Sequence, residues 1–83
     1  MFGVITNRKA AVKAQREATE TFQPGTTVGH RAHPKRQGTV SAERGRSIRI
    51  DQTASKGYVL MVFVVWEQYD EALWVHADDL TVI

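Results

Sequence analysis

The sequence predicts a mainly β fold with one N-terminal helix, in which five antiparallel strands form a small barrel. Residues 58–66 form an apolar run without a charge, an amide side chain, a glycine or a proline, and β-branched and aromatic residues dominate it. Several shorter segments of strand character follow Thr26 and are separated by turn residues. Before them, residues 8–21 contain neither glycine nor proline, which is typical of a helix. A chain of 83 residues has room for one such domain.

The predicted helix covers residues 6–21, and a threonine and an asparagine at its start can cap it. Its apolar face is thin, because it consists mainly of alanines, which bury little surface, and of Phe22 just past its end. Such a helix can lie lightly on the rest of the domain or extend to a partner, and the sequence leaves both open. We therefore expect two parts, a helical arm over residues 1–22 and a barrel over residues 23–83.

After the helix, the sequence predicts five strands joined by polar turns. Apolar side chains point to both faces of the run at 58–66, so both faces must be covered, which places this strand at the centre of the fold. The expected strands are residues 26–30, 38–42, 58–66, 72–76 and 81–83, and residues 47–51 extend the hairpin arm of the second strand. Between them we expect polar loops at residues 31–37 and 51–57, a turn at 67–71 and a 3₁₀ turn at 77–80.

Short motifs along the chain occur in an order that resembles an SH3-like small barrel of the Tudor or KOW type. They are PGTTV at 24–28, QGTV at 37–40, VVW at 64–66, WVHADDL at 74–80 and TVI at 81–83. The layout is also similar to that of small proteins of actinobacteria and their phages. The resemblance implies the barrel fold and no particular activity, because such barrels serve many functions. The connection 43–57 is longer than a compact barrel needs, and we expect it to protrude as a hairpin.

Charge is distributed unevenly along the chain. Residues 30–49 carry a net charge of about +5, whereas residues 57–83 contain no lysine or arginine and carry about −5. This asymmetry indicates nucleic-acid contact through the basic part, or contact between the basic part of one copy and the acidic part of another. The alternative is that the two parts are neighbours in the fold and neutralise each other locally.

The basic segment is the first candidate binding surface. Its cations could neutralise phosphates with a salt-dependent affinity, although no aromatic side chain lies between Gln23 and Gly57 to stack on bases. A solvated basic loop is the alternative. The residues of this surface are Arg31, Lys35, Arg36, Arg44, Arg46 and Arg49, the last three of which we expect on the protruding hairpin.

The turn after the central strand is the second candidate surface. It is acidic with one aromatic side chain, and it suits a basic partner, including the basic segment of a second copy. Trp66 and Trp74 flank it, and we expect them in the core or at its rim rather than in an aromatic cage. The residues of this surface are Glu67, Tyr69, Asp70 and Glu71.

The residues offer little for catalysis or for a cofactor. His30 and His33, with His76 far along the chain, form a weak metal pattern without a cysteine to complete it. Asp78 and Asp79 are better explained as residues that begin a helical turn than as acid–base groups. We therefore predict a non-enzymatic protein without a cofactor or metal. The N-terminus lacks the pattern of a signal peptide, so we expect a cytoplasmic protein without membrane contact.

Together these observations predict a protein-interaction or self-assembly module, which the resemblance implies to be phage-encoded. The charge asymmetry and the thin apolar face of the helix motivate this prediction. The alternative is a nucleic-acid-binding barrel that uses the basic segment 30–49.

Overall fold

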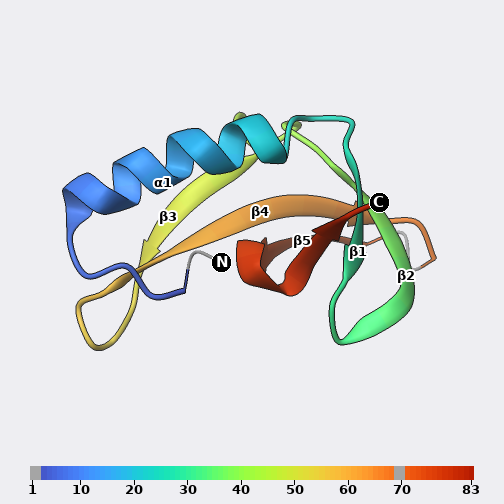
Figure 1. Ribbon diagram of the computed structural model, residues 1–83. Coiled ribbons are helices and arrows are strands. Elements are labelled where there is room, and N and C mark those ends of the chain that lie inside the picture. The colour runs from blue at the N-terminus through green and yellow to red at the C-terminus, as the bar shows by residue number, and fades with distance from the viewer. Residues whose placement is uncertain (1–2, 69–70) are drawn as a thin grey trace.

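The computed structural model describes residues 3–68 and 71–83, and these residues form one helix and six strands (Figure 1). This confirms a mainly β fold with a single N-terminal helix. The elements are α1 (Arg8–Thr21), β1 (Thr27–His30), β2 (His33–Val40), β3 (Ile48–Gln52), β4 (Tyr58–Trp66), β5 (Glu71–His76), the 3₁₀ turn η1 (Ala77–Asp79) and β6 (Leu80–Val82).

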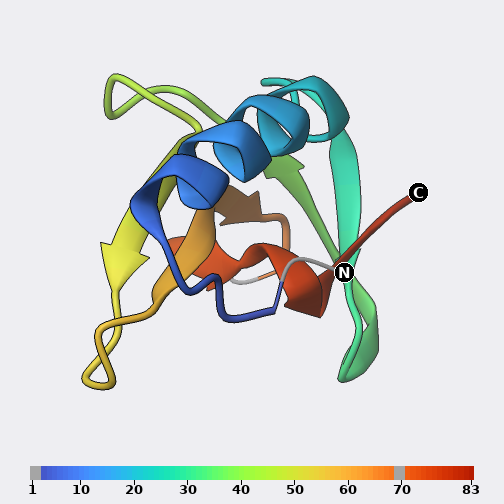
Figure 2. The same cartoon turned by 60° about the vertical axis from the view of Figure 1, so that its left-hand side comes forward.

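All strand pairs are antiparallel and belong to one sheet that curls into a half-barrel (Figure 2). Along the curl, β6 pairs with β1, β1 with β2, β2 with β4, and β4 with β5. The sixth strand, β3, also pairs with β4. The chain therefore returns to its first strand through the 3₁₀ turn and β6.

Strand β4 is paired along both edges, as its apolar sequence predicts. Strand β5 covers one edge, while β3 and β2 share the other edge, one after the other. Val62 is opposite Ile48 in β3, and Val64 is opposite Val40 in β2. Between them, the Phe63 N–H donates to the carbonyl of Ser47, and the Phe63 carbonyl accepts from the N–H of Ser41. Strands β2 and β3 thus lie end to end along β4.

The prediction that residues 43–57 protrude from the barrel as a hairpin is wrong. Residues 48–52 lie in the sheet as β3, because the alternation of isoleucine with polar residues puts Ile48 in the core, where it is 3% exposed. Outside the sheet are two short connections, residues 42–46 and the turn at residues 53–57. The prediction that residues 47–51 extend the second strand is correct in that β3 follows β2 end to end along the same edge of β4.

The polar loop expected at residues 31–37 is also wrong, because β2 begins at His33. The pairing with β1 jumps from Gly29 opposite Gln37 to His30 opposite His33, so residues 34–36 bulge out of the ladder. Proline has no N–H to offer a neighbouring strand and is tolerated in such an irregularity. The first half of β2 is a strand because its backbone pairs with β1. Its sequence lacks the alternation of apolar and polar residues by which a strand is predicted.

Helix α1 packs on its own sheet, which answers the question that the sequence left open. It lies across β3 and β4 (Figures 1 and 2). The side chain of Asn7 caps it by accepting from the N–H of Ala10. Ala11 and Ala18 are fully buried, and Phe22 is 2% exposed. The alanine face is thin because it lies close to the sheet, so small side chains suffice to fill the space.

One core joins the helix to the concave side of the sheet. The side chains of β4 that point to this side, from Leu60 to Trp66 at every second residue, pack with Ala18 and Phe22 of the helix. Trp66 is therefore a core residue, as expected. Buried side chains from the other strands complete the cluster, namely Val28, Val40, Ile48, Ala77 and Leu80. In the part of the chain that the structure describes, no helix is long and apolar enough to cross a membrane.

Replacing Gly38 with alanine is expected to lower the free energy of unfolding by about 1–3 kcal/mol. A Cβ at this position would lie 2.5 Å from Val64 Cγ1 and 2.9 Å from the carbonyl oxygen of Val65, and the backbone cannot yield easily. Urea unfolding followed by tryptophan fluorescence measures the loss. Gly29→Ala is the matched control, since its Cβ would lie 3.3 Å from two side-chain ends and 3.6 Å from the nearest backbone atom, the carbonyl oxygen of Arg36, and should cost less. Equal stability of the two variants would contradict the close approach of β2 to β4.

Phe22→Ala is expected to destabilise the protein by about 3–5 kcal/mol, because it empties a buried site between helix and sheet. Val12→Ala on the outward face, where the side chain is 44% exposed, should change stability by no more than about 0.5 kcal/mol. Thermal and urea unfolding of the two variants test this. If α1 were only lightly attached, both substitutions would be nearly neutral.

Candidate functional site

The convex side of the sheet carries a second group of apolar side chains, apart from the core. Along β4 these are Met61, Phe63 and Val65, which alternate with the core residues. Register places Phe63 opposite Trp74 of β5, and Met61 opposite Arg49 of β3. Phe63 is 1% exposed and yet lies outside the core cluster. The apolar run is thus covered on both faces, but the convex face is covered by side chains rather than by a helix.

Two arginines and two aromatic rings form the centre of this face, which we call the outer-face cluster (Arg44, Arg49, Phe63 and Trp74). The Phe63 and Trp74 rings are 5.1 Å apart between centroids and inclined at 55°. The guanidinium carbon of Arg49 lies 4.4 Å from the centroid of the Trp74 ring, and that of Arg44 lies 5.5 Å from the Phe63 centroid. Both distances fall within the range of cation–π attraction.

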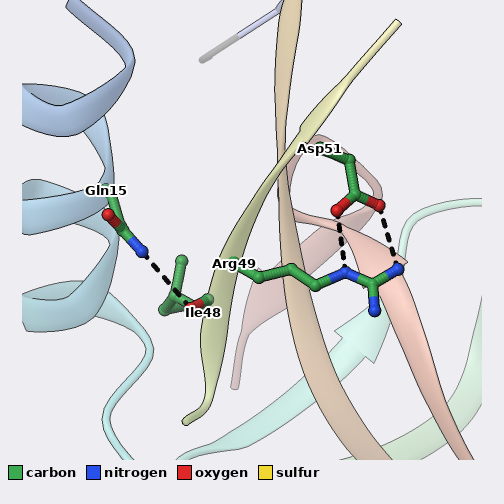
Figure 3. Close-up of polar contacts among 4 residues, drawn as sticks. All are labelled: Gln15, Ile48, Arg49 and Asp51. Atoms are coloured by element: carbon green, nitrogen blue, oxygen red, sulfur yellow. Dashed lines mark hydrogen bonds and ion pairs between the residues drawn. The ribbon is translucent and has the colours of Figure 1, made fainter. Parts of the chain in front are cut away.

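Arg49 is also held by a carboxylate on the same face of β3 (Figure 3). Its Nη2 donates a hydrogen bond of 2.9 Å to Asp51 Oδ2, and its Nε lies 2.9 Å from Asp51 Oδ1. The two side chains are 40% and 37% exposed, so solvent screens the pair and its contribution to stability is small. Its effect is to neutralise Arg49 and to fix the guanidinium group over Trp74.

The opposite side of β3 faces the helix. There Gln15 Nε2 of α1 donates to the carbonyl of Ile48 at 3.4 Å, on the other side of the strand from Arg49 (Figure 3). The outer-face cluster is therefore built on a strand that the helix supports from behind. Arg44 comes from the connection 42–46, and among the described residues it forms no ion pair. Within residues 3–68 and 71–83, it is the exposed positive charge of the cluster that no carboxylate neutralises.

The six predicted basic residues do not form one surface. Arg31 lies in the turn between β1 and β2, and Lys35 and Arg36 lie in the bulged first half of β2. The β1–β2 hairpin extends to the opposite end of the molecule from the connection 42–46 (Figures 1 and 2). Arg44 and Arg49 belong to the outer-face cluster. Arg46 instead lines a groove against the helix. Sequence neighbours are separated because β2 and β3 are laid end to end, with residues 42–46 leaving the sheet between them.

The described start of the acidic turn, residues 67–68, lies beside β2 in the same copy of the chain. The N–H of Glu67 donates to the carbonyl of Gln37, and Gln68 borders a shallow depression with His33 and Lys35. Glu67 and Glu71 are exposed. Tyr69 and Asp70, which were also predicted to belong to this surface, lie outside the described residues. This arrangement favours the alternative in which opposite charges are neighbours within one fold.

The histidines and the aspartate pair have structural surroundings. The rings of His30 and His33 are 5.2 Å apart, and His30 Nδ1 accepts a hydrogen bond from the N–H of Ala32. Within residues 3–68 and 71–83, no three histidine or carboxylate side chains are placed to hold a metal ion. Asp78 accepts a hydrogen bond from the N–H of Gly3, and the carbonyl of Asp79 accepts one from Arg31.

Two groups of surface residues were missed by the sequence analysis. The outer-face cluster depends on register between three strands, and nothing in the sequence pairs Phe63 with Trp74 or Arg44 with Phe63. The other group is a set of exposed cations on the outward face of α1, at Arg8, Lys9, Lys13 and Arg16. Their helical spacing was visible in the sequence and could have been found by plotting charge, as well as apolarity, around the helix.

Comparison with known proteins gives no relative for this chain: no family model, no curated protein and no solved structure matches it.

The contact between Arg49 and Trp74 is expected to show a coupling free energy of about 0.5–1 kcal/mol. A double-mutant cycle with Arg49→Gln and Trp74→Leu, measured by urea unfolding, gives this quantity. Lys13→Gln replaces Arg49→Gln in the control cycle, because Lys13 lies on the outward face of the helix, and its effect should add to that of Trp74→Leu. Coupling of the Arg49 cycle within error of the control would contradict the stacking.

Proposed function

We propose that this protein is a non-enzymatic protein-interaction module that binds its partner on the convex face of β3, β4 and β5. The observation that carries this proposal is the outer-face cluster, in which Trp74 and Phe63 lie between two arginines on a sheet face that α1 does not cover. Tryptophan and arginine are enriched among the residues that dominate the energetics of protein interfaces.

The surroundings of the cluster suit an apolar contact with a polar edge. Val59, Met61, Val65 and Ala72 share this face and are each partly exposed, so a partner that covers them removes apolar surface from water. The aromatic rings are already positioned by the sheet, and Asp51 fixes Arg49, so binding orders few additional side chains. Such preorganisation favours affinity.

The charges define the partner that this face would accept. Arg49 is neutralised by Asp51, whereas Arg44 is an exposed cation at the edge of the aromatic pair. An apolar segment that carries a carboxylate opposite Arg44 would complement both features. A second copy of the chain could supply this segment through its acidic turn, at Glu67 or Glu71, which is the self-assembly form of the proposal.

The strand order supports an SH3-like assignment as part of this proposal. The strands follow the order β6-β1-β2-β4-β5 around the curl, with a 3₁₀ turn before the last strand, and the motifs fall on these elements in the chain order given for the barrel. Because unrelated functions occur on such barrels, the assignment supports a scaffold role and leaves the binding function to the outer-face cluster. Nucleic-acid binding through residues 30–49 is less well supported, since the structure distributes these cations over separate parts of the surface.

Arg44→Glu is expected to reduce binding of the partner by about tenfold or more, which corresponds to about 1.4 kcal/mol. Arg46→Glu is the matched control, because it makes the same charge change in the same connection but on the side that faces the helix. Affinity capture from host lysate with quantitative mass spectrometry should retain a protein on the wild type and on Arg46→Glu, and lose it on Arg44→Glu and Trp74→Leu.

Light scattering distinguishes a partner protein from a second copy. Self-assembly should give a particle larger than the 9.3 kDa monomer, and Arg44→Glu should reduce its size whereas Arg46→Glu should not. Deleting residues 1–22 is not a suitable test, since it removes Phe22 and Ala18 from the core. The proposal is wrong if the protein is a monomer at millimolar concentration and also captures no protein from lysate. It is equally wrong if the captured protein is retained on Arg44→Glu and Trp74→Leu as well as on the wild type.

A further inference from the structure

The outward face of α1 carries a concentrated positive charge that the fold itself does not require. Residues 8–16 contain no acidic side chain and include four cations, all exposed. These side chains surround a shallow hollow over Val12, which is 44% exposed. We call this surface the helix basic face; its residues are Arg8, Lys9, Lys13 and Arg16.

The positions of these cations are unfavourable for the helix. Arg8 and Lys9 occupy the first turn, where the helix macrodipole favours acidic side chains, and that turn contains none. Lys9 and Lys13 are four residues apart, a spacing at which like charges repel. Among the described residues, none of the four cations forms an ion pair that would offset this repulsion. Glu17 and Glu20 lie four residues after Lys13 and Arg16, a spacing at which opposite charges attract, so helix stability fails to account for Arg8 and Lys9 in particular.

The cations are presented on a rigid support. Ala11 and Ala18 on the opposite side of the helix are fully buried against the sheet, and Asn7 caps the helix. The residue pair Ile5 and Tyr58 exchanges two backbone hydrogen bonds, of 2.8 and 2.7 Å, and ties down the segment that leads into the helix. A ligand that binds here would not have to order the helix first.

A fifth cation extends this face toward the C-terminal end of the helix. Arg46 lines a groove together with Gln15 and Thr19 of α1. Thr19 is three residues after Arg16, so the two positions are neighbours on the helix surface. The positive charge thus continues from the helix basic face onto the connection 42–46, which is far from Arg16 in the sequence.

We propose that the helix basic face, together with Arg46, binds the phosphate backbone of duplex nucleic acid. Arg8 and Arg16 are eight residues apart, or about 12 Å along the helix axis. One strand of a duplex carries a phosphate every 3.4 Å or so along its axis, and the face therefore spans three or four successive phosphates. This site is separate from the outer-face cluster and does not depend on the function proposed for that cluster.

The composition of the face distinguishes this ligand from two other polyanions. Single-stranded nucleic acid is held largely by aromatic side chains that stack on bases, and the helix basic face contains none. An amphipathic helix binds an anionic membrane by inserting its apolar face, but the apolar face of α1 is buried in its own core, and Val12 is the one large apolar side chain of the helix that is exposed. Contacts to phosphates alone predict binding without sequence preference.

Fluorescence anisotropy with a labelled 20-base-pair DNA duplex tests the proposal. We expect binding at 50 mM salt, with a slope of log K against log salt of about −4, so that affinity falls about a hundredfold or more by 200 mM. The variant Lys9→Gln/Lys13→Gln should reduce the magnitude of the slope by about 2. The control Lys35→Gln/Lys56→Gln removes the same charge from two exposed positions outside the face and should leave the slope unchanged.

Other outcomes would overturn the proposal. No duplex binding at 50 mM salt would do so directly, and so would an equal effect of the two double variants, because binding would then follow net charge alone. Tighter binding of a single strand of the same length would exclude a duplex backbone site. Binding to vesicles that contain phosphatidylserine, in the absence of duplex binding, would assign the face to a membrane. Circular dichroism of each variant confirms that the helix is intact.

Discussion

Strand β4 is the element on which the other positions depend, because its backbone is paired along both edges over nearly its whole length. β5 occupies one edge, and the other edge is divided between β3 and β2, with Phe63 at the junction. The Phe63 backbone bonds to Ser41 and to Ser47, and these two bonds hold the ends of β2 and β3 a short distance apart. The residues between them must leave the sheet, and they carry Arg44 and Arg46 outward.

Strand β4 has two apolar faces, and each is covered in a different way. The concave face receives α1 and becomes the core, where small alanines allow the helix to lie close to the sheet. The convex face receives no helix. Its most buried side chain, Phe63, is covered by the ring of Trp74 and by Arg44. An arginine covers an aromatic ring while its charged group stays in water, so the face remains available to a partner.

The fold separates the charges of the basic and acidic segments into several local groups. Glu67, at the start of the acidic turn, lies beside β2, since its N–H donates to the carbonyl of Gln37. Arg49 is paired with Asp51 two residues away on the same strand face. Among the described residues, the cations of the helix basic face, Arg44 and Arg46 form no ion pair within 4 Å. Two surfaces on different sides of the molecule therefore offer positive charge to a ligand.

The sequence by itself determined the helix, the central strand, the 3₁₀ turn and the mainly β class. Each of these depends on local periodicity, on capping or on an uninterrupted apolar run, which neighbouring residues specify. It did not determine that β2 begins at His33, that residues 48–52 pair with β4, or that the helix packs on its own core. The outer-face cluster likewise exists only through the register of β3, β4 and β5. Register and packing bring together residues that are distant in the chain, and a single sequence contains no signal for such pairs.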